Sequence, residues 1–109
     1  PRRPSLRDLE RDGVYTLRSA PDARAIRTAL RTARNAVVIG GGFIGLETAA
    51  VLVKAGKQVT VLEAMDRVLA RVTAREVSRF YEREHRSHGV EVRLGVAVGQ
   101  PLAAILAVL

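Results

Sequence analysis

Apolar residues along the chain form three short runs that predict β-strands, at residues 37–39, 57–63 and 90–94. The segment 46–55 contains no proline or turn signal, and residues 74–87 place apolar side chains at helical spacing, so both connections are predicted as helices. Strands that alternate with helices in this way are joined by right-handed crossovers and form a parallel sheet. We therefore predict an α/β fold, one βαβαβ half of a doubly wound parallel sheet with helices on both faces, which makes three layers.

One more strand and one more helix are predicted ahead of these runs. Residues 14–17 have the composition of a short strand. Ser19 and Asp22 then have the spacing of a capping box, and the apolar residues of segment 23–33 fall on one helical face while arginines take the other. Residues 1–13 hold prolines and a glycine among charged residues, which is typical of a linker that enters from an upstream domain.

The helix before the third run has its own start and stop signals. Thr73 and Glu76 form a second capping box, so this helix is expected to begin at Ala74, to continue to about Ser87 and to end before Gly89. The segment between the second run and this helix is predicted as a loop. The buried face of the helix is expected to consist of Val77, Phe80 and Tyr81.

The first strand meets its helix in the spacing G-x-G-x-x-G, formed by Gly40, Gly42 and Gly45. In a dinucleotide-binding unit these glycines allow a sharp turn, leave room for a pyrophosphate and let the helix approach its strand. The phosphates would bind amide N–H groups at the positive end of the helix dipole. A glycine turn that serves packing alone is the alternative. Glu63 favours the nucleotide, because it ends the second strand, where a carboxylate holds ribose hydroxyls in a Rossmann-like unit.

Composition narrows the chemistry. A chain of 109 residues allows at most one domain, and the absence of cysteine excludes disulfides, thiolate nucleophiles and Cys-ligated metals, so redox chemistry would need a bound cofactor. His85 and His88 have no third ligand at metal-binding spacing and are expected at the surface or capping a helix end. No apolar stretch reaches the roughly 20 residues of a membrane span, and no signal peptide is recognisable. We expect a cytoplasmic protein without a metal or a membrane partner.

The formal net charge of +7 comes mainly from scattered arginines. Acidic residues are interleaved with them, and the aromatic residues that stack on single-stranded nucleic acid are missing from the basic stretches, which speaks against a nucleic-acid partner. A solvated basic face is favoured, with an acidic protein or a negatively charged cofactor as the alternative explanation.

Residues 40–47, with the sequence GGGFIGLE, resemble the NADH-binding domain of the FAD-dependent pyridine-nucleotide oxidoreductases. Within them the chain is most similar to the reductases that feed ferredoxins and rubredoxins in oxygenase systems. The resemblance runs over about residues 13–94 and includes segments 67–73 and 80–82, which are more family-specific than the glycines. It implies that the pyrophosphate of NADH is held by Gly40, Gly41, Gly42, Phe43, Ile44 and Gly45.

The resemblance also assigns three charged residues. It implies that Glu47 lies near the nicotinamide end of NADH, that Glu63 binds the adenosine ribose, and that Arg71 reaches the adenosine part. A carboxylate at Glu63 would repel the 2′-phosphate of NADPH, which favours NADH. Arg67 and Arg71 are the counter-argument, since either arginine could receive that phosphate.

The chain departs from this family in length. Such reductases are several times longer, and their FAD-binding glycine motif, later flavin-contacting segment and interface domain cannot be recognised here. The similarity stops after residue 98, which leaves an incomplete NAD(P)-binding domain at 14–98 and an apolar tail of unknown role at 99–109. FAD would belong to the parent enzyme, and no catalytic residue is assigned to this chain.

Three functions follow from these observations. The first is an NADH-binding segment of a reductase that passes hydride from NADH to FAD and electrons to a ferredoxin or rubredoxin. The second is a stand-alone or truncated nucleotide-binding module without activity, and the third is an FAD-binding unit. NAD is favoured over FAD, because FAD motifs usually open their chain and Glu47 fits the pyridine-nucleotide version. Without the second half of the sheet, strand 36–39 would keep an unpaired edge, on which a dimer or the apolar tail is expected to pack.

Overall fold

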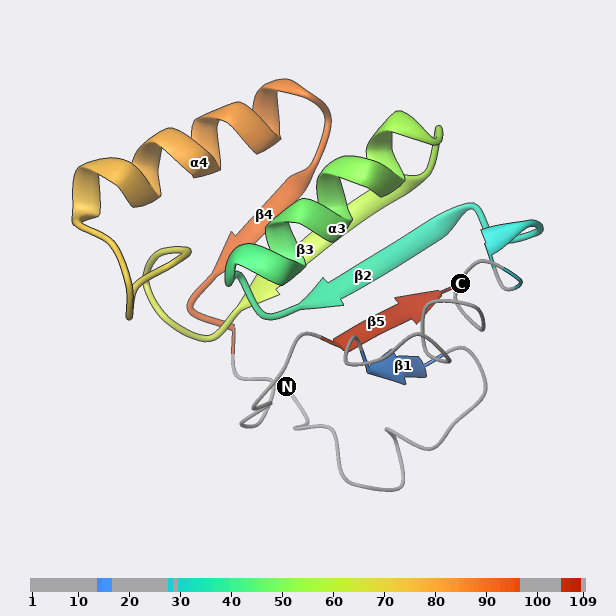
Figure 1. Ribbon diagram of the computed structural model, residues 1–109, viewed down its shortest axis with the longest axis horizontal. Coiled ribbons are helices and arrows are strands. Elements are labelled where there is room, and N and C mark those ends of the chain that lie inside the picture. The colour runs from blue at the N-terminus through green and yellow to red at the C-terminus, as the bar shows by residue number, and fades with distance from the viewer. Residues whose placement is uncertain (1–13, 17–27, 29, 97–104, 109) are drawn as a thin grey trace.

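A computed structural model of the protein describes residues 14–16, 28, 30–96 and 105–108, and all structural statements concern these residues. The strands are β1 (Val14–Thr16), β2 (Asn35–Ile39), β3 (Gln58–Glu63), β4 (Glu91–Leu94) and β5 (Ile105–Val108). The two helices bounded within this part are α3 (Phe43–Lys54) and α4 (Arg75–Ser87). The strands form one sheet in the order β1-β5-β2-β3-β4 (Figure 1). Neither described helix is long and apolar enough to cross a membrane.

Strands β2, β3 and β4 form the parallel part of the sheet. Helix α3 connects β2 to β3, α4 connects β3 to β4, and Figure 1 shows both helices on the same face. Two right-handed crossovers that advance in the same direction place their helices in this way. The predicted α/β class, the βαβαβ order and the parallel arrangement of its three strands are confirmed, whereas the sheet as a whole is mixed because β1 and β5 pair antiparallel. The helix predicted after Ser19 falls outside the described residues, apart from the helical Thr28 and Leu30, so a layer on the second face stays a prediction.

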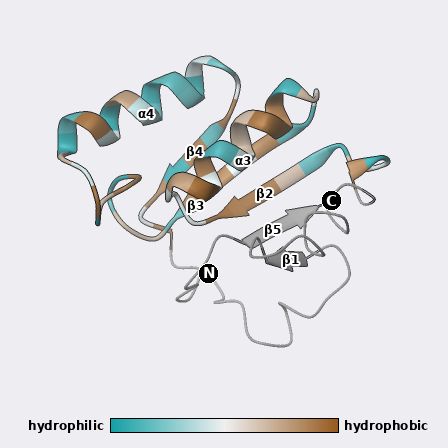
Figure 2. Ribbon diagram, in the orientation of Figure 1, coloured by the Kyte–Doolittle hydropathy of each residue, from teal (hydrophilic) through white to brown (hydrophobic). Residues whose placement is uncertain are grey.

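The core lies between α3 and the facing side of the parallel strands. Helix α3 contributes Leu46, Ala49 and Leu52, all of them buried. Figure 2 shows α3 as largely hydrophobic and α4 as largely hydrophilic. Burial of one such aliphatic side chain contributes about 1.5–3 kcal/mol, so this layer fixes α3 on the sheet. The buried residues of the strand segments are Ala36, Val38, Val59, Val61, Val90 and Val92.

Helix α4 has nearly the predicted bounds but a different start. It covers Arg75–Ser87, and Gly89 follows with a φ of 96°, as expected of a residue that ends a helix. The predicted capping box is wrong, because Ala74 is the N-cap and no side chain caps the helix. The hydroxyl of Thr73 donates to Leu69 O at 3.1 Å and does not cap a backbone amide of the helix.

The predicted buried face of α4 is wrong for Val77 and Phe80, whereas Tyr81 packs against the core. Val77 is 40% exposed and Phe80 is 51% exposed, whereas Ser78 and Glu82 are buried and Tyr81 is half-buried. The physical reason is that α4 meets the loop after β3 through hydrogen bonds of Ser78 and Glu82. Val77 and Phe80 therefore lie on a side of the helix that this contact leaves exposed.

The edge of β2 that was expected to be unpaired is covered by β5. The two strands are antiparallel, with Ala36 opposite Val108 and Ile39 opposite Ile105. Strand β1 pairs in turn with the other side of β5, also antiparallel. The prediction of an unpaired edge is therefore wrong, and the expected placement of the apolar tail on that edge is confirmed for its described residues, 105–108. The argument for a dimer through this edge is removed.

Candidate nucleotide-binding site

The turn between β2 and α3 depends on glycine at two positions. Gly40 leaves β2 with a φ of 111°, in the region that favours glycine, and its N–H donates to Leu62 O at 2.8 Å. A Cβ on Gly45 would overlap Gly40 O and stand 3.2 Å from Val38 Cγ1. Helix α3 can therefore lie directly against β2 only because Gly45 has no side chain.

The start of α3 is open. Gly42 is the N-cap, exposed and in an extended conformation, without a side-chain cap and with no acidic residue in the first turn. Leu46 N donates to Gly42 O at 3.0 Å, and the amide groups that precede Leu46 lie before the regular helical bonds. A Cβ built on Gly42 meets no atom within 4 Å. This end of the helix thus combines free space with the positive end of the helix dipole, which suits an anion.

The carboxylate of Glu63 is fixed against the glycine turn. Oε1 accepts a hydrogen bond from Gly41 N at 2.9 Å, and Oε2 accepts one from Met65 N at 2.7 Å. An ionised carboxylate has about four acceptor sites, so these two bonds leave capacity for hydroxyl groups. Glu63 is half-buried. Its position at the end of β3, beside the turn, brings the predicted ribose and pyrophosphate positions together.

The loop between β3 and α4 packs on the same turn. Leu69 N donates to Gly41 O at 2.8 Å, and Val68 is fully buried. A Cβ on Gly41 would stand 3.0 Å from Val68 Cγ1 and 3.2 Å from Glu63 Oε1. Leu69 has a φ of 55°, which is uncommon for a residue with a side chain. Gly41 is thus enclosed by this loop and by Glu63, and only a very small residue fits there.

The remaining predicted site residues lie at the surface. Phe43 and Ile44, in the first turn of α3, are 49% and 59% exposed, and the ring of Phe43 contacts Tyr81 edge-on at 6.1 Å between centroids. Glu47 and Arg71 are exposed, and neither side chain forms a hydrogen bond or an ion pair with the described residues. The structure therefore brings the glycine turn and Glu63 together. The side chains of Glu47 and Arg71 form no polar contact with the described residues.

The two histidines have different roles. His88 Nδ1 lies 2.8 Å from Glu84 O, so the predicted capping position is confirmed for this residue. His85 is half-buried, with Nδ1 2.9 Å from Tyr81 O and Nε2 2.9 Å from Leu46 O. His85 thus links α4 to α3. Among the described residues, no three possible metal ligands come together.

Sequence reasoning assigned no role to three residues that shape the site, namely Val68, Leu69 and Glu82, although they lie in the segments 67–73 and 80–82 that carry the family resemblance. Val68 and Leu69 meet Gly41 as described above, and Glu82 Oε2 accepts a hydrogen bond from Val68 N at 3.1 Å. An apolar pair in a predicted loop gives no signal of this contact. Glu82 could have been suspected from its spacing of four after Ser78, which puts two polar residues on one helix face.

Residues 1–101 match the pyridine nucleotide-disulphide oxidoreductase family, and the chain belongs to this family. It is 55% identical over 86 residues to the ferredoxin reductase subunit of the 5,5'-dehydrodivanillate O-demethylase of Sphingobium sp., which covers 79% of this chain and 21% of that protein. The ferredoxin reductase for the CYP199A2 system of Rhodopseudomonas palustris superposes with a TM-score of 0.78 at 35% identity, over 81% of this chain and 22% of that one.

A third relative is a water-forming NADH oxidase of Lactobacillus brevis, whose structure was determined with NADH bound. Its TM-score is 0.75 at 30% identity, and the match covers 87% of this chain and 20% of the oxidase. The chain thus spans about a fifth of the length of each of these relatives.

Proposed function

We propose that this chain is the NADH-binding segment of a flavoprotein reductase, in which hydride passes from NADH to FAD and electrons pass on to a ferredoxin or rubredoxin. The observation that carries the proposal is the hydrogen bond from Gly41 N to Glu63 Oε1, at 2.9 Å. It joins an acidic strand end to an uncapped, glycine-lined helix start. A dinucleotide requires these two features side by side, because its ribose and its pyrophosphate are adjacent groups.

The residues present fit the phosphates of NADH. The first amide groups of α3 provide donors, Gly42 provides space, and no carboxylate in the first turn opposes an anion. In this proposal Gly40, Gly41, Gly42, Phe43, Ile44 and Gly45 hold the pyrophosphate. Their part is to bind and orient the nucleotide, and NADH when bound supplies the hydride.

The residues present also fit the adenosine half. Glu63 has acceptor capacity for the ribose hydroxyls, because two backbone donors use only part of it. Arg71 is exposed on the loop that packs against Gly41, and we assign it to the adenosine part. We assign Glu47, one turn into α3, to the nicotinamide end.

The flavin and the iron–sulfur partner belong to the parent enzyme in this proposal. The relative from Sphingobium is named as a ferredoxin reductase subunit, and the relative from Lactobacillus brevis binds NADH. The first name supports a ferredoxin-type acceptor, and the second supports NADH as the nucleotide. This chain contributes the surface that positions the nicotinamide.

Calorimetric titration of the purified chain with NADH, and separately with FAD, tests the proposal. We expect heat of binding with NADH, and no visible flavin absorption that stays with the protein after gel filtration. The Glu63→Ala variant should bind NADH more weakly. Tight retention of FAD together with no detectable NADH binding would replace the proposal by a flavin-binding unit.

A further inference from the structure

The side of α4 that faces the loop after β3 is polar along its whole length. Arg75 Nη1 bonds Asp66 Oδ2 at 3.3 Å, and Arg79 Nη1 bonds Asp66 O at 3.4 Å. Ser78 and Glu82 complete the same face, since positions three and four apart on a helix are neighbours. This face therefore contacts the loop through hydrogen bonds. A surface helix usually packs on its neighbours through apolar side chains instead.

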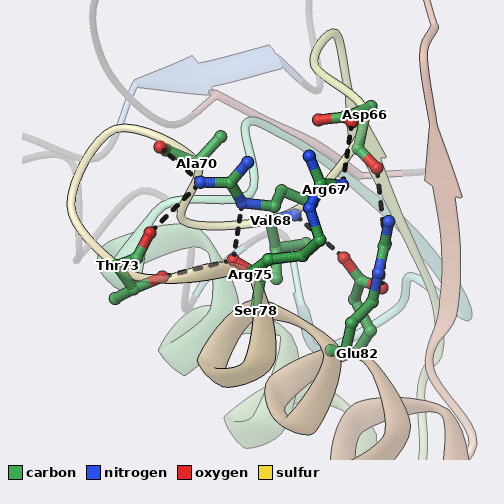
Figure 3. Close-up of polar contacts among 9 residues, drawn as sticks. Asp66, Arg67, Val68, Ala70, Thr73, Arg75, Ser78 and Glu82 are labelled. Atoms are coloured by element: carbon green, nitrogen blue, oxygen red, sulfur yellow. Dashed lines mark hydrogen bonds and ion pairs between the residues drawn. The ribbon is translucent and has the colours of Figure 1, made fainter.

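Arg67 holds the second half of the loop from inside. Its Nη2 donates to Ala70 O and to Thr73 O, both at 3.2 Å, and its Nε donates to Ser78 Oγ at 3.3 Å (Figure 3). Ser78 Oγ also lies 3.2 Å from Thr73 Oγ1. The Nε and Nη2 donors of Arg67 are thus used within the protein, whereas the exposed side chain of Arg71 forms no hydrogen bond or ion pair with the described residues.

Glu82 holds the first half of the loop. Its side chain is 2% exposed, and its Oε2 accepts a hydrogen bond from Val68 N at 3.1 Å (Figure 3). Its Oε1 accepts a hydrogen bond from Arg79 Nη1 at 2.7 Å. The hydrogen bond and the negative charge of Glu82 raise the pKa of Arg79 above its ordinary value. The ion pair is weak evidence for stability, because the Glu82 carboxylate is desolvated while the Arg79 side chain is 39% exposed, so that desolvation and solvent screening offset their attraction. Stabilisation alone therefore does not explain why the Glu82 carboxylate is buried at this place.

The position of Val68, to which Glu82 is hydrogen-bonded, explains the burial of this carboxylate. Val68 borders Gly41, and the next residue, Leu69, donates to Gly41 O at 2.8 Å. Gly41 N in turn donates to Glu63 Oε1 at 2.9 Å. A continuous series of short contacts therefore runs from α4 through Val68 to the carboxylate that faces the ribose.

We propose that Glu82 is a positioning residue of the nucleotide site, which fixes Val68 against the glycine turn and so sets the affinity for NADH and the preference for NADH over NADPH. The inference rests on the proposed function. Glu82 does not touch the nucleotide itself, because it is buried on the far side of Val68. When its contact to Val68 is lost, Gly41 and Glu63 lose their fixed spacing.

Three variants test this assignment. Glu82→Leu fills a similar volume without an acceptor, so Val68 N loses its partner while an apolar side chain replaces the buried charge. Glu82→Gln keeps an oxygen that can accept from Val68 N. Glu84→Leu changes an exposed acid on the same helix and is the matched control. The measurements are the dissociation constants for NADH and NADPH, and the hydrogen exchange rates of the amides of Gly41, Val68 and Leu52.

We expect Glu82→Leu to weaken NADH binding by about tenfold, which corresponds to about 1.4 kcal/mol, and to bring the NADPH-to-NADH ratio of dissociation constants closer to one. The ratio of the two dissociation constants is the decisive measurement, because a smaller folded fraction would raise the constants for NADH and NADPH by the same factor. Exchange at Gly41 and Val68 should accelerate, while the core amide of Leu52 keeps its rate. Glu82→Gln should recover most of the affinity and of the ratio, and Glu84→Leu should match the parent.

Two results would overturn the inference: a Glu82→Leu variant with parental affinity and ratio, or equal acceleration of exchange at Leu52, which would make Glu82 a stabilising residue only. Failure of the proposed function gives a different result, since the parent chain itself would then bind neither nucleotide.

Discussion

Glu63 Oε1 and Gly41 N are 2.9 Å apart, so the end of β3 and the turn after β2 behave as one unit. If the turn holds the pyrophosphate as proposed, this carboxylate lies beside the adjoining ribose. The negative charge of Glu63 would then face a group attached to the ribose 2′-oxygen.

NADH should therefore bind more tightly than NADPH. The 2′-phosphate would add a charge of about −1.5 to −2 beside Glu63, and the Nε and Nη2 donors of Arg67 are not available to it because they form hydrogen bonds within the loop. Charges a few ångströms apart near a surface repel by about 1–4 kcal/mol, so NADPH should bind roughly tenfold or more weakly. Titration of both nucleotides checks the difference, and equal affinities would contradict it. Glu63→Ala should narrow the gap, and Arg71→Ala should widen it.

Gly42→Val should abolish detectable nucleotide binding while the fold persists. A Cβ at Gly42 has no neighbour within 4 Å, and the extended backbone there accepts valine, so the cost is limited to a poorer N-cap, about 1 kcal/mol. The added methyl groups would occupy the space assigned to the pyrophosphate. Circular dichroism and an NADH titration measure the two effects separately. Normal binding with native helix content would disprove the phosphate assignment, and Gly42→Ala should be intermediate.

Gly45→Ala should destabilise the chain although it lies within a helix. Alanine is favoured over glycine in helices by about 1 kcal/mol, but its Cβ would overlap the carbonyl oxygen of Gly40. Overpacking of this kind costs about 1–3 kcal/mol or more, and the obstacle is backbone that cannot rotate away. Urea unfolding should give a lower midpoint for Gly45→Ala than for Gly42→Ala. The reverse order would show that α3 does not lie against β2 as described.

The chain alone should not turn over NADH, even with free FAD added. Hydride transfer needs two rings held about 3–3.5 Å apart, and such positioning can supply about 7–11 kcal/mol of a barrier. The described residues contain one glycine turn of the nucleotide-binding type, between β2 and α3. NADH consumption with FAD and an artificial electron acceptor, against a control without protein, provides the measurement. Turnover near the usual range of about 1–10³ per second would require a second cofactor surface in this chain.

Most of the parallel sheet could be predicted because its signals are local. Apolar runs, a glycine turn and Gly89 after α4 each depend on a few neighbouring residues, and the strands and helices follow from them. The interior of α4 could not be predicted in this way. Its buried positions are Ser78 and Glu82, and periodicity of apolar residues cannot detect a face that packs through hydrogen bonds.

The role of Arg67 shows the same limit at the site. An arginine four residues after Glu63, the acid that we assign to the ribose, fits both a phosphate contact and a structural contact. Only the positions of Ala70 O, Thr73 O and Ser78 Oγ show that its Nε and Nη2 donors are already used within the protein. The series of contacts from Glu82 through Val68 to Gly41 likewise can be seen only in the folded loop, since these residues lie far apart in the sequence.

The antiparallel pairing of β5 also constrains the order of folding. Ala36 meets Val59 after 23 positions but meets Val108 only after 72, and closing the longer loop first would cost about 1 kcal/mol more. The parallel strands should form before β5 joins them. Since β1 has β5 as its partner in the described sheet, Val14–Thr16 can be added only after that. Val14–Thr16, the first described segment in the sequence, is thus the last strand to join the sheet, which forms from its parallel strands outward.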